Sequence, residues 1–161
     1  MTRTMDQPRE VAFTWQVHAG LEAMAARADA KAGILLAHQG GAFVLGISAW
    51  QMGGSPAVVL AMLLVVAAMG TSIAVVAPVL RPKGRMVAIG DLIYFGHLRE
   101  WQAQSLAERL GELSEDDELA MVSRQLVTLS RINWRKHRLL QISLSLTVSA
   151  MSIGAVAVTL L

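Results

Sequence analysis

The residues of this sequence best suited to bind a small ligand are cations that precede two apolar segments. Arg27 and Lys31 stand before the first segment, with Asp29 between them. Four further cations stand before the last segment: Arg131, Arg135, Lys136 and Arg138. If the two regions pack together, the cations could balance the charge of a phosphate, and Asp29 could accept hydrogen bonds from a ribose or a base.

Aromatic residues accompany these cations in the sequence: Tyr94, Phe95, Trp101 and Trp134. Aromatic faces can stack a nucleic-acid base, which would complete a nucleotide site. The same residues also fit a simpler interpretation, in which the cations form a collar at the cytoplasmic membrane surface and the aromatic rings anchor at the interface. Physical reasoning from the residue types alone favours the collar.

Catalytic motifs are scarce. The four histidines (18, 38, 97 and 137) include no pair spaced by four residues and no HExxH motif. The sequence also lacks a Walker loop, a GxSxG elbow and a GxGxxG loop. It has no cysteine for a disulfide or a thiolate metal site. We therefore expect no enzyme activity, no catalytic residue, no metal and no cofactor.

The composition indicates a membrane protein. Of the 161 residues, 54% are hydrophobic and only 16% are charged, and the mean hydropathy is +0.48. Soluble domains carry roughly 25% charged residues. Three segments hold the roughly 20 apolar residues that a helix needs to span a bilayer: residues 32–52, 56–80 and 139–161. Charges throughout the residues before the first span argue against a secretory signal peptide.

The charges predict how the spans are oriented. All 14 Lys and Arg residues lie within residues 3–31 and 81–138, and the acidic residues fall in the same two stretches. Because cytoplasmic segments collect Lys and Arg, we predict that both stretches are cytoplasmic and that the C-terminus is periplasmic. The net charge of +2 and the pI near 9.5 reflect this membrane-facing basicity and do not indicate nucleic-acid binding.

Helical patterns connect the spans to the cytoplasmic stretches. Residues 10–31 read as a helix that continues without a breaker into the first span. Residues 86–113 also have a helical apolar pattern. Ser114, with Asp117 three residues later, predicts a capping box at the start of a helix that continues into the third span.

The predicted fold class is all-α. Three transmembrane helices sit beneath a cytoplasmic helical layer, which is formed by extensions of the first and third spans together with residues 86–138. We treat residues 1–161 as a single membrane domain, in which residues 81–138 are a cytoplasmic helical insert.

Three residues of the first span are candidates for gating or packing: Gly33, His38 and Gly41. The two glycines and Ala37 fall four apart on one face, which would let another helix approach closely in lipid. A bend at the cytoplasmic end of the span is the alternative. An ionisable group such as His38 inside a span is a functional hypothesis by default. It lies only about 9 Å of helix rise into the span, however, so it could simply reach the interface.

Hydroxyl side chains share one face of the third span: Ser145, Ser149, Ser152 and Thr159. Such a stripe can hydrogen-bond to a neighbouring helix, or it can line a wetted interface. Helix contact is the simpler interpretation.

Three segments resemble motifs of one known family. The segment "ARADAKAGILLAHQGG" is similar to an AD-x-KA pattern that leads into a first membrane helix. The segment "GDLIYFGHL" is similar to an FFG segment that follows the second membrane helix. The segment "LVTLSRINWRKHRLL" is similar to an LS…K pattern at the entry into the last membrane helix. From about residue 20 onward, the order and placement of these three segments resemble those in the transmembrane class of Pycsar anti-phage effectors. "HQGG" departs from the polar, Asn-like position expected in the first span. The matching positions are Asp29, Lys31, Ala32, Tyr94, Phe95, Gly96, Ser130 and Lys136.

The resemblance implies antiviral defence at the bacterial inner membrane. A partner pyrimidine cyclase would make cyclic CMP or cyclic UMP after infection, and the effector would respond by impairing the membrane, which causes abortive infection. Because three spans cannot enclose a pore alone, we expect a homo-oligomer in contact with the lipid bilayer. The residues that we expect to bind the ligand are Asp29, Lys31, Tyr94, Phe95, Ser130, Arg131 and Lys136.

Two other functions compete with this one. A membrane scaffold could recruit a protein partner through its cytoplasmic helices, without any nucleotide ligand. A constitutive, holin-like lesion fits poorly, because such a protein needs no insert like residues 81–138.

Overall fold

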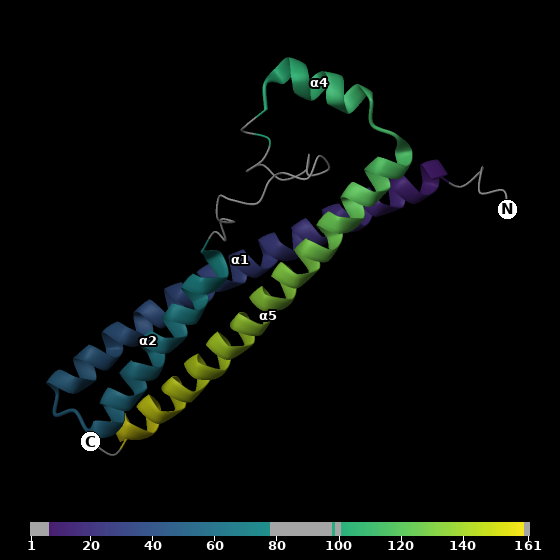
Figure 1. Cartoon of the computed structure of the whole chain (residues 1–161). Coiled ribbons are helices and arrows are strands. Elements are labelled where there is room, and N and C mark those ends of the chain that lie inside the picture. Colours follow the sequence, from purple (N-terminus) through teal and green to yellow (C-terminus); the bar gives the residue numbers. More distant parts are fainter. Residues whose placement is uncertain (1–6, 78–97, 99–100, 160–161) are drawn as a thin grey trace. The chain divides into compact units, whose positions relative to one another are not determined.

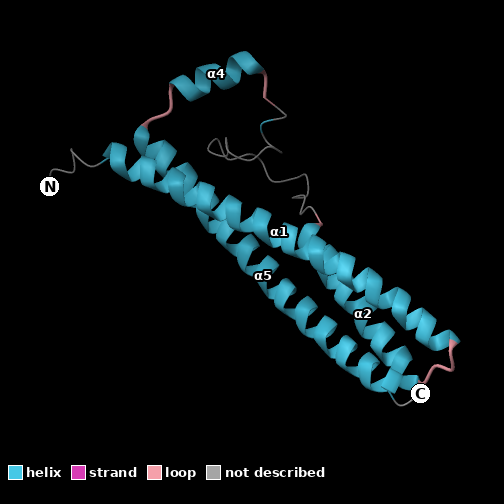
Figure 2. Cartoon of the chain, turned by 180° about the vertical axis from the view of Figure 1, so that it is seen from behind, coloured by secondary structure: helices cyan, strands magenta, loops and turns pink. Residues whose placement is uncertain are grey.

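The structure is a computed structural model that describes residues 7–77, 98 and 101–159 (Figure 1). Its helices are α1 (Gln7–Gln51), α2 (Pro56–Val76), α4 (Ala103–Gly111) and α5 (Glu115–Thr159). No strand occurs among the described residues (Figure 2). The predicted all-α fold class is confirmed, and three of the helices are long and apolar enough to cross a membrane.

The two longest helices extend well beyond the thickness of a bilayer. α1 and α5 hold 45 residues each, which corresponds to about 68 Å of helix. The hydrocarbon core of a bilayer is only about 30 Å thick. The only proline in either helix is Pro8, in the first turn of α1, where a missing N–H costs nothing. The prediction that the first and third spans continue longer helices is therefore confirmed.

The connection between α1 and α2 depends on two glycines. Gly53 has a φ of +116°, which residues with a side chain rarely adopt. A Cβ on Gly54 would lie 2.6 Å from the Cα of Trp50, so only glycine lets the chain turn back this closely. Pro56 then begins α2, which ends at Val76. Residues 78–80 of the predicted second span lie outside the described residues.

The chain divides into two compact units, and α1 and α5 contribute to both. We call Met1–Ala23 with Leu80–Ile132 the polar unit, and Met24–Val79 with Asn133–Leu161 the membrane unit. Each is described by itself below. The treatment of residues 1–161 as one domain stays a prediction.

In the polar unit, the first part of α1 contacts the start of α5. Trp15 Nε1 donates a hydrogen bond of 2.7 Å to the carboxylate of Glu118. His18 and Val122 are buried nearby in the same unit. The indole therefore ties the two helices together at a point where α5 carries its acidic first turn.

The predicted capping box at the start of α5 is confirmed. Ser114 Oγ accepts a hydrogen bond from the Asp117 amide at 3.2 Å, and the hydroxyl donates to the Asp117 carboxylate at 2.7 Å. That donated hydrogen bond is the main reason why the pKa of Asp117 lies below its usual value. The polar residue before the helix thus satisfies an amide that has no partner within α5.

The predicted helix over residues 86–113 is wrong in part. α4 begins only at Ala103, because Gln102 has an extended backbone (φ −83°, ψ 142°) and acts as its N-cap. Residues 86–97, 99 and 100 lie outside the described residues.

In the membrane unit, α1, α2 and α5 run side by side (Figures 1 and 2). The apolar residues buried between them are small: Ala28, Ala32, Ala49, Val58, Ala61, Val65, Ala68, Val75, Ala150 and Ala157. Large apolar side chains point outward instead, among them Leu45, Leu63, Ile73 and Val148. Small residues let helices approach closely, and lipid accepts large apolar ones, so this distribution is the one expected of a bundle in a bilayer.

Candidate functional site

Asp29 on α1 and Lys136 on α5 form an ion pair in the membrane unit. Lys136 Nζ donates a hydrogen bond to Asp29 Oδ1 at 2.5 Å. Ala28 and Ala32, which are 1% and 0% exposed, leave room for α5 to approach this part of α1. The Asp29 side chain keeps 38% of its surface exposed and Lys136 keeps 18%. A small polar ligand can therefore reach the pair from one edge.

The pair lies at one end of the membrane-spanning part of the unit. Residues 29–50 of α1 rise about 32 Å, close to the hydrocarbon thickness of about 30 Å. Trp50 is exposed at the far end of this stretch, and Trp134 is exposed two residues before Lys136. Because exposed tryptophans are typical of membrane–water interfaces, we infer that the ion pair lies where the headgroups begin.

A second polar contact lies deeper in the same unit. Gln39 of α1 donates hydrogen bonds to Ser143 Oγ at 2.9 Å and to Thr147 Oγ1 at 2.8 Å, both on α5. Ser72 of α2 meets Ser143 through an O···O contact of 2.6 Å. The side chains of Gln39, Ser72 and Ser143 are completely buried, and Thr147 is 4% exposed. We call these four residues the Gln39 cluster.

The hydrogens of the Gln39 cluster are all in use. Gln39 Nε2 gives both of its hydrogens to Ser143 and Thr147. Thr147 donates to the Ser143 carbonyl at 2.8 Å, and Ser143 donates to the Ala68 carbonyl at 3.1 Å, which leaves Ser72 to donate to Ser143. Gln39 Oε1 is buried and has no hydrogen-bond partner. The cluster joins three helices and still keeps one strong acceptor unpaired.

Only part of the Gln39 cluster could be predicted from the sequence. The "HQGG" interruption marked the right turn of α1, but we singled out His38 rather than its neighbour Gln39. Ser143 and Thr147 were also missed, although their spacing of four residues in an uncharged span was the signal that could have revealed them.

The three gating or packing candidates lie on the outer surface of α1. His38 is exposed, and its Nδ1 lies 2.8 Å from the Ile34 carbonyl of its own helix. A Cβ built on Gly33 or Gly41 would meet nothing within 4 Å. Within the described residues, this face of α1 therefore packs against no other helix of the chain, and the roles of the three residues stay predictions.

Among the described residues, none of the other predicted ligand residues contacts the ion pair. Lys31 is exposed on α1, and no described residue pairs with it. Ser130 and Arg131 are exposed residues of the polar unit. Tyr94 and Phe95 lie outside the described residues. Their roles in ligand binding stay predictions.

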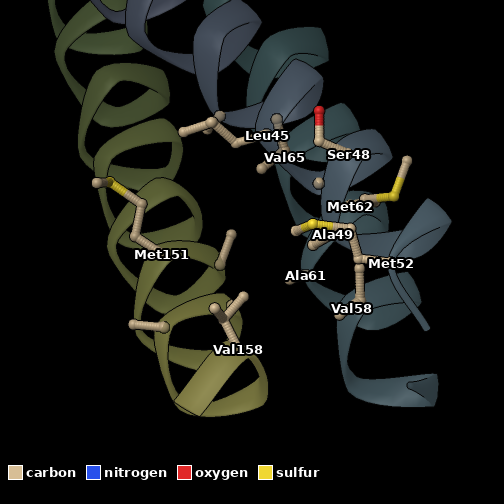
Figure 3. A pocket seen from close by; sticks show the side chains of 15 residues that line it. Leu45, Ser48, Ala49, Met52, Val58, Ala61, Met62, Val65, Met151 and Val158 are labelled. Carbon is tan, nitrogen blue, oxygen red and sulfur yellow. The ribbon is translucent and has the colours of Figure 1, made fainter. Parts of the chain in front are cut away.

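The membrane unit also contains a cavity of about 440 Å³ near the turn between α1 and α2 (Figure 3). Apolar side chains and glycines line it, and Ser48 is the only polar side chain that lines it. A phosphate would find no cation there, so the cavity cannot serve as a nucleotide site. The described residues also contain no group of His, Cys, Asp and Glu that could hold a metal ion.

Chemically, the site is thus a partly exposed Lys–Asp pair at the membrane surface, set above a neutral and fully buried cluster. Lys136 has three ammonium hydrogens, and Asp29 accepts one of them. Such a pair can exchange its partner for an anionic ligand, while the cluster below keeps α1 and α5 together.

Comparison with known proteins identifies the family. The family model for the Pycsar effector protein domain (PycTM) matches residues 13–161. No curated protein and no solved structure matches the chain.

Proposed function

The chain belongs to the Pycsar effector family, and from that premise we propose that it binds cyclic CMP or cyclic UMP and then impairs the bacterial inner membrane. Membership makes the chain an anti-phage defence effector, and its three long apolar helices make it a membrane protein. In the function that we propose, a pyrimidine cyclase supplies the nucleotide after infection, and the membrane damage aborts the infection. The effector itself would act by binding, without catalysis.

The observation that carries this proposal is the Asp29–Lys136 pair. The phosphate of a cyclic nucleotide can take the place of Asp29 beside Lys136 Nζ, because an ammonium binds either anion with charge-assisted hydrogen bonds. The released Asp29 carboxylate can then accept hydrogen bonds from the ribose or the base. Lys31 is exposed two residues along α1, about 200° round the helix axis from Asp29, so its long side chain would reach the ligand only around the edge of α1 as a second cation. The proposal uses these three residues of the membrane unit.

Exchange of the partner would change how α1 and α5 are held together at the membrane surface. A switch from about 1% to about 99% active requires roughly 5.5 kcal/mol of differential affinity for the active arrangement. A phosphate held by two cations, together with hydrogen bonds to Asp29, is of the right order to supply it. Since three spans per chain are too few to enclose a path, the active form would be a homo-oligomer. We place the ion pair on the cytoplasmic side, with the C-terminus in the periplasm.

Calorimetry and a leakage assay test the proposal together. The purified full chain is titrated with cyclic CMP, cyclic UMP and, as a purine control, cyclic AMP. The same protein is then placed in vesicles of phosphatidylethanolamine and phosphatidylglycerol, and the release of a trapped ion is followed. We expect heat and release with at least one pyrimidine nucleotide and neither with cyclic AMP. A protein that gives no heat and no release with any nucleotide would support the scaffold function instead.

A further inference from the structure

Polar side chains run along the outward face of α5 through the whole membrane unit. All of them are exposed: Arg138, Gln141, Ser145, Ser149, Ser152 and Thr159. They recur every three or four residues, apart from a gap of seven between Ser152 and Thr159, which places them on one face of a helix. From Arg138 to Thr159 this face rises about 32 Å, roughly the full hydrocarbon thickness. We call it the outward polar face.

Three of the four hydroxyls of this face have no hydrogen-bond partner among the described residues. Ser145, Ser149 and Ser152 make no hydrogen bond to another described residue, and Thr159 bonds only to the Val156 carbonyl of its own helix. The inward hydroxyls of the same helix, by contrast, bond to Gln39 within the buried cluster. α5 therefore carries hydroxyls on two faces and satisfies only one of them within the chain.

Neighbouring outward surfaces of the bundle are apolar. α2 exposes Leu60, Leu63, Val66 and Ile73. On α5 itself, Leu144 and Val148 are exposed beside the outward polar face. The chain thus places large apolar residues where a surface meets lipid. An unpaired hydroxyl is disfavoured in such surroundings, so the three unpaired hydroxyls of Ser145, Ser149 and Ser152 on one face are an exception that requires a polar neighbour.

We propose that the outward polar face of α5 lines a water-filled path for ions between copies of this chain. The inference rests on the proposed function and names the way in which the membrane is impaired. A contact between two helices is satisfied by one or two hydroxyls. A water-filled path, in contrast, needs a polar group at every turn across the bilayer, and α5 supplies one on all but the turn around Val156.

Cysteine accessibility tests this inference, because the chain contains no cysteine of its own. The path variants are Ser145→Cys, Ser149→Cys and Ser152→Cys, which change one atom each. The matched controls are Leu144→Cys and Val158→Cys, which lie on the same helix, are turned about 100° or more from the centre of the outward polar face, and are each 52% exposed. Each full-length variant is placed in vesicles of phosphatidylethanolamine and phosphatidylglycerol and activated with cyclic CMP and cyclic UMP. Ion release is measured before and after a membrane-impermeant methanethiosulfonate reagent is added.

We expect the reagent to remove most of the nucleotide-dependent release from the three serine-to-cysteine variants and to leave both controls unchanged. Normal release before the reagent shows that a variant is folded. Persistent release in all five variants would overturn the inference and leave the proposed function intact. Disulfide-linked dimers at Ser145→Cys or Ser149→Cys without any block would likewise overturn it, in favour of a closed helix contact. No release from the unmodified chain with either nucleotide would instead overturn the proposed function, and the path with it.

Discussion

The membrane unit joins α1 to α5 by two polar contacts that differ in charge, burial and number of partners. The Asp29–Lys136 pair is charged, partly exposed and made by two side chains. The Gln39 cluster is neutral, almost fully buried and made by four side chains from three helices. They lie about 15 Å apart along α1, so one is at the membrane surface and the other is near the middle of the bilayer.

These differences assign the two contacts different tasks. Water can replace either member of a partly exposed pair, and an anion can replace Asp29 beside Lys136, at small cost, since such pairs contribute only about 0 to 1 kcal/mol. A buried hydrogen-bond donor has no such substitute inside hydrocarbon. The pair is therefore suited to respond to a ligand, and the cluster is suited to hold the bundle while the pair responds.

Removal of the cation from the pair should give the largest effect. Lys136→Ala takes away the group that receives the phosphate, so we expect nucleotide-dependent ion release to be abolished while membrane insertion is unchanged. Release from vesicles and carbonate extraction of membranes measure the two properties. Arg135→Ala is the matched control, because it removes one exposed cation from the neighbouring position. Normal release from Lys136→Ala would show that the ion pair is not the nucleotide site.

A break in the buried cluster should affect stability rather than ligand response. Ser143→Ala leaves one Gln39 N–H and the Ser72 hydroxyl without their present partner. We expect a loss of about 1 to 2 kcal/mol in the free energy of unfolding. Circular dichroism during unfolding by dodecyl sulfate in mixed micelles measures it.

Gln39→Leu is the variant to compare with Ser143→Ala. It removes the two hydrogen bonds that join α1 to α5, but this loss is offset because it also removes the unpaired Oε1, while Ser143 and Thr147 still donate to the carbonyls of Ala68 and Ser143. The expected change in unfolding free energy is therefore small, about 0.5 kcal/mol or less in either direction. If Gln39→Leu were the more damaging of the two, the hydrogen-bond assignment of the cluster would be wrong.

Neutralisation of the anion in the pair should make activation easier. Asp29→Asn weakens the resting contact with Lys136 but keeps an oxygen that can accept from a ribose or a base. We expect the nucleotide concentration for half-maximal release to fall by up to about fivefold, the equivalent of about 1 kcal/mol for a partly exposed pair. Asp29→Ala removes the acceptor as well and is the control. A higher nucleotide requirement in Asp29→Asn would mean that the resting pair does not restrain activation.

The smallest effect is expected at the Ser114 cap of α5, an exposed contact that serves as a reference for the ion pair and the Gln39 cluster. Ser114→Ala removes the N-cap of α5, so the Asp117 amide loses its acceptor. We expect exchange of that amide with deuterium to accelerate by roughly two- to fivefold. The amides of α4 report on the same unit and should exchange at an unchanged rate.

The same cap predicts the sign of a pH effect. Because the Ser114 hydroxyl bonds to the Asp117 carboxylate and lowers its pKa, the folded state binds that proton less readily than the unfolded state. The stabilisation is complete above the ordinary pKa of an aspartate and is lost as the pH falls through the lowered value. Amide exchange at the start of α5, corrected for its intrinsic pH dependence, should therefore accelerate in acid, and Ser114→Ala should reduce this acceleration.

Much of the fold could be predicted because it depends on local properties of the chain. Hydropathy and length located the spans, the lack of a breaker predicted that two of them continue as longer helices, and the Ser114 pattern predicted a cap. The predictions failed where no strong local signal existed. Gln102, the N-cap at which α4 begins inside the helix predicted over residues 86–113, is not a residue type that usually interrupts a helix.

The candidate site was predicted as two separate groups of residues, and only the structure shows which members meet. Asp29 and Lys136 were both expected to bind a ligand, but no pattern indicated that they would first bind each other. Gly33 and Gly41 were expected to pack against another helix, and in the described structure they face outward.

By itself, the sequence determined that this protein is a helical membrane protein, where its spans lie and which residues can carry charge at the membrane surface. Only the tertiary structure decided the rotation of each helix about its own axis. His38 and Gln39 show the difference, because these neighbours lie about 100° apart on α1 and one is exposed while the other is completely buried. The physical reason is that lipid and bundle interior are similarly apolar, so hydrophobicity does not distinguish the two sides of a spanning helix. Close packing and a few hydrogen bonds make that distinction instead.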